Sequence, residues 1–114
     1  MKINQKNALK IWMERYGDSL IEEDFDGGIM YRDAYGDENA WICINNEILY
    51  CGWNLHHILP ISNGGTNDKG NLECTNIVTN ERAGNKTTFI IDGTKYQLKK
   101  VKGSRCKYQI VVIG

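Results

Sequence analysis

The chain has little proline, little histidine and no long apolar run. Its 114 residues include one proline and two histidines, and 41 % of them are hydrophobic. No stretch approaches the ~20 apolar residues that a membrane helix needs, and Met1 to Ala8 lack the apolar segment of a secretory signal. We therefore expect one ordered domain, residues 1–114, that is intracellular, cytoplasmic and without a membrane partner.

The four cysteines lack the spacing of a structural metal site. They stand at positions 43, 51, 74 and 106, and no two of them form a Cys-x-x-Cys pair. If Asn45 and Asn46 form a two-residue hairpin turn, Cys43 pairs with Ile48, and Cys51 lies on the opposite face of the ribbon. We expect reduced thiols that pack as small hydrophobic residues, rather than zinc ligands or disulfides.

The formal net charge is zero, but the charges are unevenly distributed along the chain. Residues 1–51 carry five Lys or Arg against ten Asp or Glu, residues 52–85 carry two against three, and residues 86–114 carry seven against one. The net charges of these segments are therefore −5, −1 and +6. The basic last segment favours a surface for a polyanion, and mutual neutralisation of the two ends on folding is the alternative.

Local patterns predict an α+β fold. Apolar spacing over 4–16, with Asn4 as the N-cap and Gly17 as the stop, predicts a helix, and the acidic stretch 18–39 predicts loops with a helical turn near Tyr31–Tyr35. A hairpin is expected around Asn45-Asn46. The remaining expected elements are strands at 53–58, 72–75, 89–91, 96–101 and 108–113, and a short helix over 76–82 that ends at Gly84.

The two histidines are adjacent, and asparagines follow them at defined intervals. His56 and His57 end an apolar strand-like run, Asn71 follows His57 by fourteen residues, and Asn80 follows Asn71 by nine. The loop between them reads Pro-Ile-Ser-Asn-Gly-Gly-Thr-Asn over residues 60–67, and Leu follows Asn71 directly. This segment, about Trp53 to Lys86, resembles the HNH nuclease motif in its variant with asparagine as the third letter.

The resemblance implies a fold and a reaction. The fold is a ββα-metal (HNH, His-Me finger) core at about 53–86, with an N-terminal helix and hairpin before it and a C-terminal antiparallel β-meander after it. The reaction is metal-dependent endonucleolytic hydrolysis of DNA phosphodiester bonds, by nicking with low sequence specificity. In the family the residue before the base holds the metal, so the resemblance implies His56 as metal ligand, His57 as general base, Asn71 as the brace that orients the base, and Asn80 as second metal ligand. Asn85 is the alternative to Asn80.

The residue types suit this chemistry, with two departures from the family pattern. Histidine is the natural base near neutral pH because its reference pKa is about 6.5. Many relatives have Asp where this chain has His56, and two neutral ligands bind a hard cation weakly. We therefore expect one divalent cation, Mg²⁺ or Mn²⁺, with Zn²⁺ or Ni²⁺ as alternatives. The lysine that often follows the third letter is replaced by Ala83, which leaves Arg82 or Lys86 to contact phosphate.

DNA is the expected partner, with RNA as the alternative. Lys95, Lys99 and Lys102 in the basic segment suit contact with a nucleic-acid backbone. The three tryptophans, Trp12, Trp41 and Trp53, are expected in the core rather than as stacking platforms. A non-catalytic nucleic-acid-binding module that keeps the HNH fold is the alternative function. A monomer or a homodimer is compatible with the sequence, as is an inhibitor partner.

Overall fold

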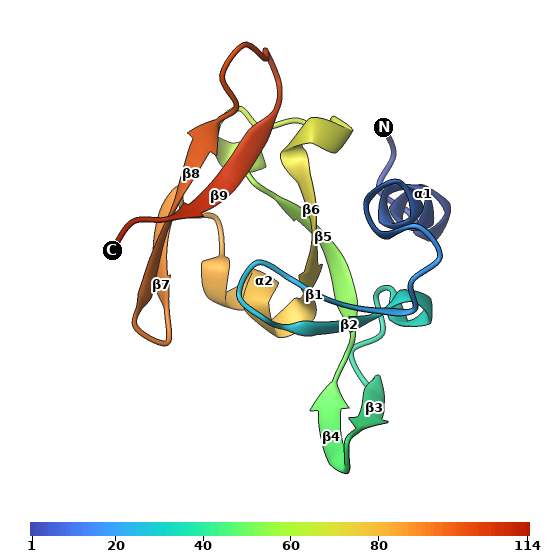
Figure 1. Ribbon diagram of the computed structural model, residues 1–114. Helices are drawn as coiled ribbons and strands as arrows, with labels where there is room; N and C mark the ends of the chain where they lie inside the picture. Colours follow the sequence, from blue (N-terminus) through green and yellow to red (C-terminus); the bar gives the residue numbers. More distant parts are fainter.

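The computed structural model describes residues 1–114, and it has an α+β fold. Two helices accompany four small antiparallel sheets (Figure 1). In chain order the elements are α1 (Gln5–Tyr16), β1 (Ile21–Glu23), β2 (Ile29–Tyr31), β3 (Trp41–Ile44), β4 (Glu47–Tyr50), β5 (Trp53–His57), β6 (Leu72–Asn76), α2 (Ile77–Ala83), β7 (Thr88–Ile91), β8 (Thr94–Lys100) and β9 (Tyr108–Val112), with 3-10 turns at Arg32–Ala34, Ile61–Asn63 and Lys69–Asn71. Neither helix is long and apolar enough to cross a membrane.

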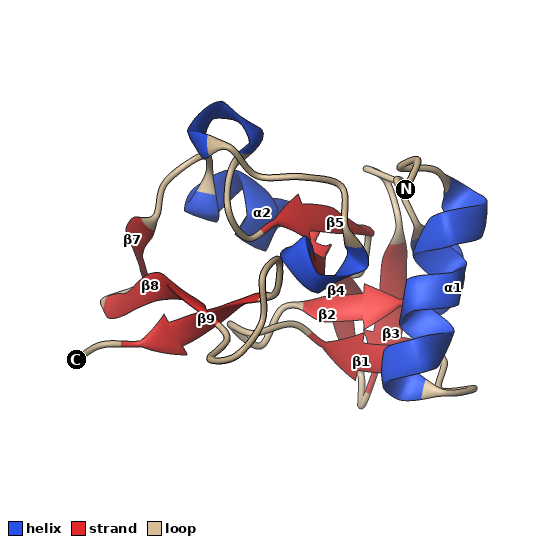
Figure 2. Ribbon diagram, turned by 90° about the horizontal axis from the view of Figure 1, so that it is seen from above, coloured by secondary structure: helices blue, strands red, loops and turns tan.

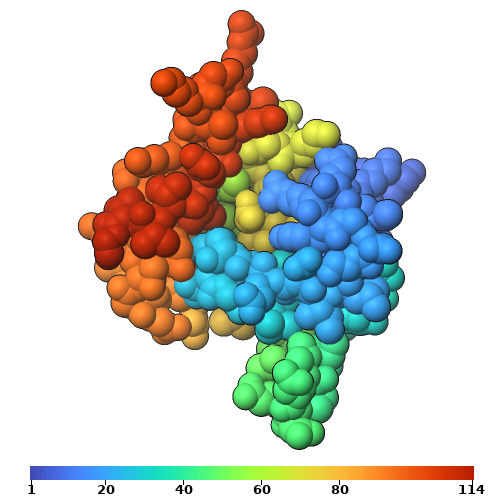
Figure 3. Space-filling model, viewed as in Figure 1, coloured from blue at the N-terminus to red at the C-terminus, as the bar shows by residue number.

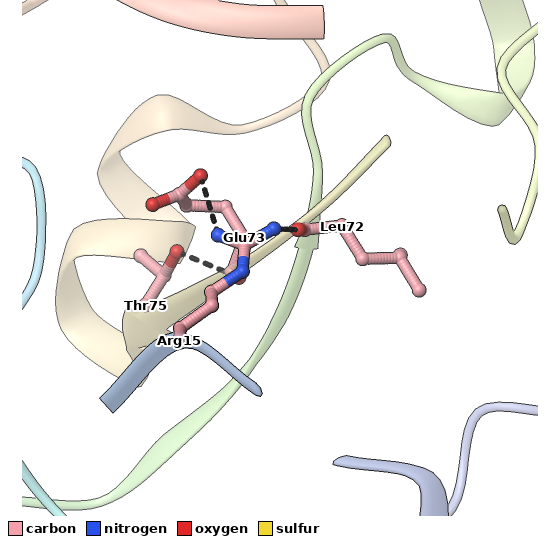
Figure 4. A network of polar contacts seen from close by, with 4 residues as sticks. All are labelled: Arg15, Leu72, Glu73 and Thr75. Carbon is pink, nitrogen blue, oxygen red and sulfur yellow. Dashed lines mark hydrogen bonds and ion pairs between the residues drawn. The ribbon is translucent and has the colours of Figure 1, made fainter. Parts of the chain in front are cut away.

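Helix α1 confirms the prediction for residues 4–16. The side chain of Asn4 accepts a hydrogen bond from the Asn7 amide at 2.9 Å, and Gly17 ends the helix at φ 62°. In its last turn, Arg15 donates to the Leu72 carbonyl at 2.5 Å and pairs with Glu73 at 3.1 Å (Figure 4). The helix is thereby fixed against β6.

The main hydrophobic core lies between α1 and the strands β2, β5 and β6. Trp12 and Trp53, both fully buried as predicted, meet there with ring centroids 4.9 Å apart. The other buried members are Ala8, Ile11, Met30, Ala34, Cys51, Leu55, Leu72 and Cys74. Cys51 and Cys74 therefore pack as small hydrophobic residues, as expected.

The β3–β4 hairpin has the predicted turn but corrects three predictions of burial. Asn45 and Asn46 have φ angles of 51° and 67°, and Cys43 pairs with Ile48. The hairpin projects from the body of the molecule (Figure 3), so Trp41 is 63 % exposed and Cys43 is exposed as well. Cys106, in the turn after β8, is also exposed. The predicted burial of these three side chains is wrong because their segments have no layer packed over them.

Residues 18–39 form more structure than the sequence predicts. The helical turn near Tyr31–Tyr35 is confirmed at Arg32–Ala34, but β1 and β2 form a hairpin where loops were expected. The turn of this hairpin is organised by Asp24, whose carboxylate accepts hydrogen bonds from the amides of Asp26 and Gly28. Side-chain acceptance by Asp in a short turn is a local signal that the acidic composition obscures.

The C-terminal strands form the predicted β-meander in the order β7-β8-β9. Its inner face makes a second, smaller core from Ala83 of α2 with Phe89, Ile91 and Tyr96. Helix α2 lies between this sheet and the β5–β6 pair, and α1 lies on the far side of the molecule (Figure 2). The termini are well separated (Figure 1).

Candidate active site

The candidate site is formed where β5 and β6 pair and α2 packs against them. The two strands are antiparallel, with His56 opposite Glu73 and His57 opposite Leu72. Because neighbouring residues on a strand point to opposite faces, the two histidines diverge. His56 faces α2, and His57 faces the loop between β5 and β6, as their hydrogen bonds show.

A chain of three polar side chains crosses from β5 to α2. The Nδ1 atom of His56 lies 2.5 Å from Oδ1 of Asn80, and Nδ2 of Asn80 donates to Oδ1 of Asn54 at 2.6 Å. Asn54 and His56 share a face of β5 because they are two residues apart. The amide of Asn80 is therefore held from both sides, with its oxygen turned toward the imidazole.

The environment of His56 favours its neutral form. The residue is 4 % exposed, and its Nε2 atom is buried without a hydrogen-bond partner. Burial is the main cause that lowers the pKa of His56; the hydrogen bond with Asn80 opposes the shift, and the nearby His57 adds to it. A neutral imidazole is the form that binds a metal ion.

His57 is held by a residue to which the motif assigns no role. Its Nε2 atom lies 2.7 Å from Oδ1 of Asn67, in the loop between β5 and β6. With the proton on Nε2 donated to this oxygen, the lone pair is on Nδ1. A side chain that fixes the tautomer of a histidine is the usual companion of a general base.

Asn71 braces the loop. Fully buried, it accepts from the Leu59 amide at 2.7 Å and donates to the carbonyls of Leu59 and Thr66 at 3.0 and 2.9 Å. All of these bonds hold the backbone, and none reaches the side chain of His57. The bracing contacts lie where the sequence places them, and the contact that orients the His57 ring comes from Asn67 instead.

The residues of the His56–Asn80 pair fit a divalent cation. At 2.5 Å, Nδ1 of His56 and Oδ1 of Asn80 share a proton. To bind one cation at the usual ~2.1 Å each, the two atoms would turn their lone pairs toward it and move apart. No group of three or more His, Cys, Asp or Glu side chains is assembled in the protein. A cation held here would therefore complete its coordination with water and substrate oxygens, as Mg²⁺ and Mn²⁺ commonly do.

A surface cavity opens beside this pair. It has a volume of about 330 Å³, and Asn54, Asn80 and Asn85 contribute to its wall. Of the two alternatives that the sequence leaves open for the second ligand, Asn80 makes the contact with His56. Asn85 is exposed beyond the end of α2 and forms no hydrogen bond with either histidine.

The predicted phosphate-contacting residues are not gathered around the histidines. Arg82 pairs with Asp92 at 3.1 Å and so ties α2 to the β7–β8 turn, while Lys86 is exposed after α2. Lys95 and Lys99 alternate with the inward-facing Tyr96, so they lie on the sheet face turned away from α2. The fifth predicted residue, Lys102, is in the β8–β9 turn, which projects from the body (Figure 3).

Another lysine, not singled out by the sequence, lies nearer the site. The side chain of Lys107 covers Gly70, where an added Cβ atom would be 2.7 Å from Lys107 Cγ. Gly70 belongs to the 3-10 turn Lys69–Asn71, against which β9 packs. Lys69 of the same turn is also exposed and forms a surface ion pair with Glu14 at 3.4 Å. The basic C-terminal segment thus reaches the loop that carries Asn71.

Asn54 and Asn67 are the site residues that the sequence does not reveal. A signal existed for both, since Asn54 lies two residues before His56 on the same strand face and Asn67 ends the loop pattern over residues 60–67. The bond between Asn67 and His57 depends on the path of the loop. Comparison with known proteins adds no relative, since no protein-family model, no curated protein and no solved structure matches this chain.

Proposed function

We propose that the protein is a metal-dependent endonuclease of the HNH type, with β5, β6 and α2 as its ββα-metal core and DNA as its substrate. The observation that carries the proposal is the contact of His56 with Asn80 between strand and helix, next to a His57 held by Asn67. Two adjacent histidines thus have different partners on opposite faces of one strand, as binding and proton transfer require.

His57 acts as the general base. Asn67 accepts a hydrogen bond from Nε2–H of His57, so Nδ1 carries the lone pair. Nδ1 takes a proton from the attacking water while the oxygen of that water bonds to phosphorus. The bond from phosphorus to the 3′-oxygen breaks in the same displacement. Asn71 supports this step at a distance, because its three bonds to Leu59 and Thr66 fix the loop that carries Asn67.

His56 and Asn80 would hold the cation that the resemblance implies. When bound, the divalent ion supplies charge neutralisation at the phosphate and at the leaving 3′-oxygen. Burial keeps His56 neutral and available as a ligand. Asn54 keeps the oxygen of Asn80, rather than its amide nitrogen, directed at the same point.

The basic C-terminal segment supplies the surface for the DNA backbone. Lys69 and Lys107 lie beside Gly70, in the loop that carries Asn71. The β8–β9 turn extends this surface outward with Lys102 and Arg105. Contacts of this kind bind phosphates without reading bases. We therefore expect low sequence preference, and one site per chain means that a monomer nicks one strand.

The proposal is tested on supercoiled plasmid with Mg²⁺, Mn²⁺, Ni²⁺, Zn²⁺ or EDTA. The wild-type protein converts the plasmid to open circle in at least one metal, and EDTA abolishes the conversion. His57→Ala lowers the rate by ~10²- to 10⁴-fold, while retardation of the plasmid on a gel is unchanged.

Two results would contradict the proposal. Equal rates for His57→Ala and the wild type would remove His57 as the base. Retardation without cleavage in every metal would instead assign the non-catalytic binding module. That second candidate is favoured by one observation, which is that a proton shared between Nδ1 of His56 and Oδ1 of Asn80 satisfies these two atoms without a cation.

A further inference from the structure

A second cavity lies between the β3–β4 hairpin and helix α2. It has a volume of about 380 Å³, within the range of small-ligand sites. Its wall consists of Glu38, Trp41, Tyr50, Ile77, Val78 and Glu81. Three of these residues, Glu38, Ile77 and Glu81, also line the cavity that contains Asn54 and Asn80. The two cavities are therefore neighbouring parts of one surface depression that leads to the candidate metal ligands.

The aromatic wall of this cavity is held in place before any ligand binds. The hydroxyl of Tyr50 donates to the Asp37 carbonyl at 3.1 Å, which fixes the tyrosine ring. Trp41 packs edge-on against that ring, with centroids 5.4 Å apart and an interplanar angle of 72°. Because Trp41 is still 63 % exposed, much of the indole remains free to be covered.

The two carboxylates decide what kind of group this surface binds. Glu38 and Glu81 are exposed and line both cavities. Beside Trp41 they repel phosphate and so disfavour entry of the nucleic-acid backbone, whereas at the Asn80 end a bound cation would offset their charge. Carboxylates accept hydrogen bonds from the amino groups of bases, and tryptophan stacks on a base of any type. The carboxylates therefore suit the edge of a nucleobase, and the indole of Trp41 suits its face.

We propose that this cavity binds one unstacked nucleobase that carries an exocyclic amino group, next to the phosphate that is cut. The inference rests on the proposed function, because continuity with Asn54 and Asn80 makes the base part of the substrate. A base within an intact duplex has its faces covered by its neighbours. The substrate is therefore single-stranded or locally unpaired DNA at the site of cleavage.

The arrangement also separates the two halves of the substrate. The projecting β3–β4 hairpin and the basic β8–β9 turn lie at opposite ends of the molecule (Figures 1 and 3), whose longest dimension is 42 Å. If a base stacks at the hairpin end and phosphates bind at the β8–β9 end, His56 and His57 lie between the two contacts. An oligonucleotide of about ten nucleotides is long enough to engage both, within the range known for single-strand binders.

Binding without cleavage tests the inference. Labelled single-stranded ten-nucleotide DNAs of cytidine, adenosine or thymidine are titrated in EDTA by fluorescence anisotropy, and tryptophan quenching is followed in parallel. Trp12 and Trp53 are fully buried, so quenching reports on Trp41. The wild type binds the cytidine and adenosine strands more tightly than thymidine. Trp41→Ala weakens binding by about 5- to 100-fold, and Trp41→Phe restores part of it.

Two further variants separate stacking from recognition. Glu81→Gln narrows the difference between cytidine and thymidine strands, because it removes a charged acceptor for the amino group. Ile90→Ala is the matched control, since Ile90 is 64 % exposed on β7, outside both cavities, and its loss leaves binding unchanged.

The inference fails if Trp41→Ala binds as tightly as Ile90→Ala, or if thymidine is bound as well as cytidine. It also fails if sedimentation shows a dimer that Trp41→Ala dissociates, because the surface then belongs to a second copy of the chain. Plasmid nicking by the wild type is scored separately. Nicking with Trp41-independent binding refutes the base site alone, whereas Trp41-dependent binding without nicking refutes the catalytic proposal.

Discussion

At the scale of the residue, orientation rather than charge distinguishes the candidate ligands. Neither His56 nor Asn80 carries a negative charge, so neither attracts a cation strongly by itself. What the structure provides is a fixed direction, because the Asn80 amide donates to Asn54 and its oxygen therefore faces His56. A partner that orients a ligand in this way commonly changes metal affinity by 10- to 100-fold, to order of magnitude.

Two substitutions of Asn54 test this positioning role, one expected to lower Mn²⁺ affinity and one expected to raise it. Asn54→Leu frees the Asn80 amide to rotate, and we expect Mn²⁺ affinity to fall about 10-fold. Asn54→Asp keeps the acceptor and adds a charge beside the pair, so affinity rises by a similar factor. Calorimetric Mn²⁺ titration of each variant measures both. Asn85→Leu is the control in the same cavity wall, and equal affinities in all four proteins would show that Asn54 has no positioning role.

The motif assigns roles to some residues of the candidate site and none to others, for a physical reason. His56, Asn71 and Asn80 recur at spacings that follow from strand, loop and helix, and the contacts of Asn71 and Asn80 occur where those spacings place them. Asn67 is one of several loop asparagines, and its selection by His57 depends on the fold of the whole loop. Which loop asparagine meets a histidine is a long-range property that local pattern does not encode.

At the scale of the element, the start of α2 is joined by hydrogen bonds to two other parts of the fold. Asn76 caps the helix by accepting from the Val78 amide at 2.9 Å, and its Nδ2 donates to the Ile29 and Tyr50 carbonyls at 2.7 and 3.2 Å. Its own amide donates to Asp24 at 3.0 Å. One residue thus joins α2, β2 and the end of β4, and it sets the position of the helix that carries Asn80.

The Asp24 carboxylate is the other half of this junction. It is 8 % exposed and accepts from the amides of Asp26, Gly28 and Asn76. A Cβ atom at Gly28 would lie 2.5 Å from Oδ2 of Asp24 and 2.8 Å from Cβ of Asn76, so only glycine fits. The carboxylate thereby satisfies three backbone donors, of which the Asn76 amide is buried and the other two are partly buried.

Removal of this carboxylate should loosen the whole junction. We expect Asp24→Ala to lower the free energy of unfolding by about 2–4 kcal/mol, because it leaves buried amides unsatisfied. Urea unfolding followed by circular dichroism measures the change. Asp33→Ala is the control, because Asp33 is exposed and forms only a surface ion pair with Arg32, worth about 0–1 kcal/mol. A loss for Asp24→Ala no larger than for Asp33→Ala would refute the junction.

The same junction explains which elements the sequence predicts. Helix α1, the β3–β4 turn, β5, β6, α2 and the meander each follow from a cap, a turn pair or an apolar period within a few residues. The β1–β2 hairpin is not predicted, because the local signal of its turn, Asp24, is obscured by the acidic composition, and Asp24 is itself bonded to Asn76, far along the chain. The prediction that Trp41 is buried fails for a related reason. Its strand has the residue pattern of a half-buried sheet, but the strand projects beyond the body and Trp41 is exposed.

At the scale of the whole molecule, two cores are joined by few links. The main core is built on Trp12 and Trp53, and the smaller one joins α2 to the C-terminal meander. Phe25 enters the smaller core from the β1–β2 turn, with ring centroids 5.1 Å from Tyr96. The Tyr96 hydroxyl donates to Asp26 of the same turn at 2.5 Å. The basic meander is thus attached to the acidic N-terminal half through an aromatic contact and a charge-assisted hydrogen bond.

This link predicts how stability depends on alkaline pH. Burial, reinforced by the hydrogen bond and charge of Asp26, raises the pKa of Tyr96 to about 12 from 10.0. Below pH 10 both the folded and the unfolded chain keep the phenolic proton. Above it the unfolded chain loses the proton first, so this contribution to stability declines as pH rises toward the folded-state value.

Tyr96→Phe isolates that contribution. At neutral pH the variant loses the bond to Asp26, and we expect its free energy of unfolding to be about 1–3 kcal/mol lower than that of the wild type. The gap should close by up to about 1.4 kcal/mol per pH unit above pH 10, because only the wild type has this phenol to deprotonate. Urea unfolding of both proteins from about pH 8 to about pH 11 measures the gap. Burial also raises the pKa of Tyr16, Tyr35 and Tyr50, but both proteins contain these tyrosines, so their contributions cancel in the difference. A gap that stays constant over this range would mean that Tyr96 titrates alike in both states, and that the meander is held to the N-terminal half by packing alone.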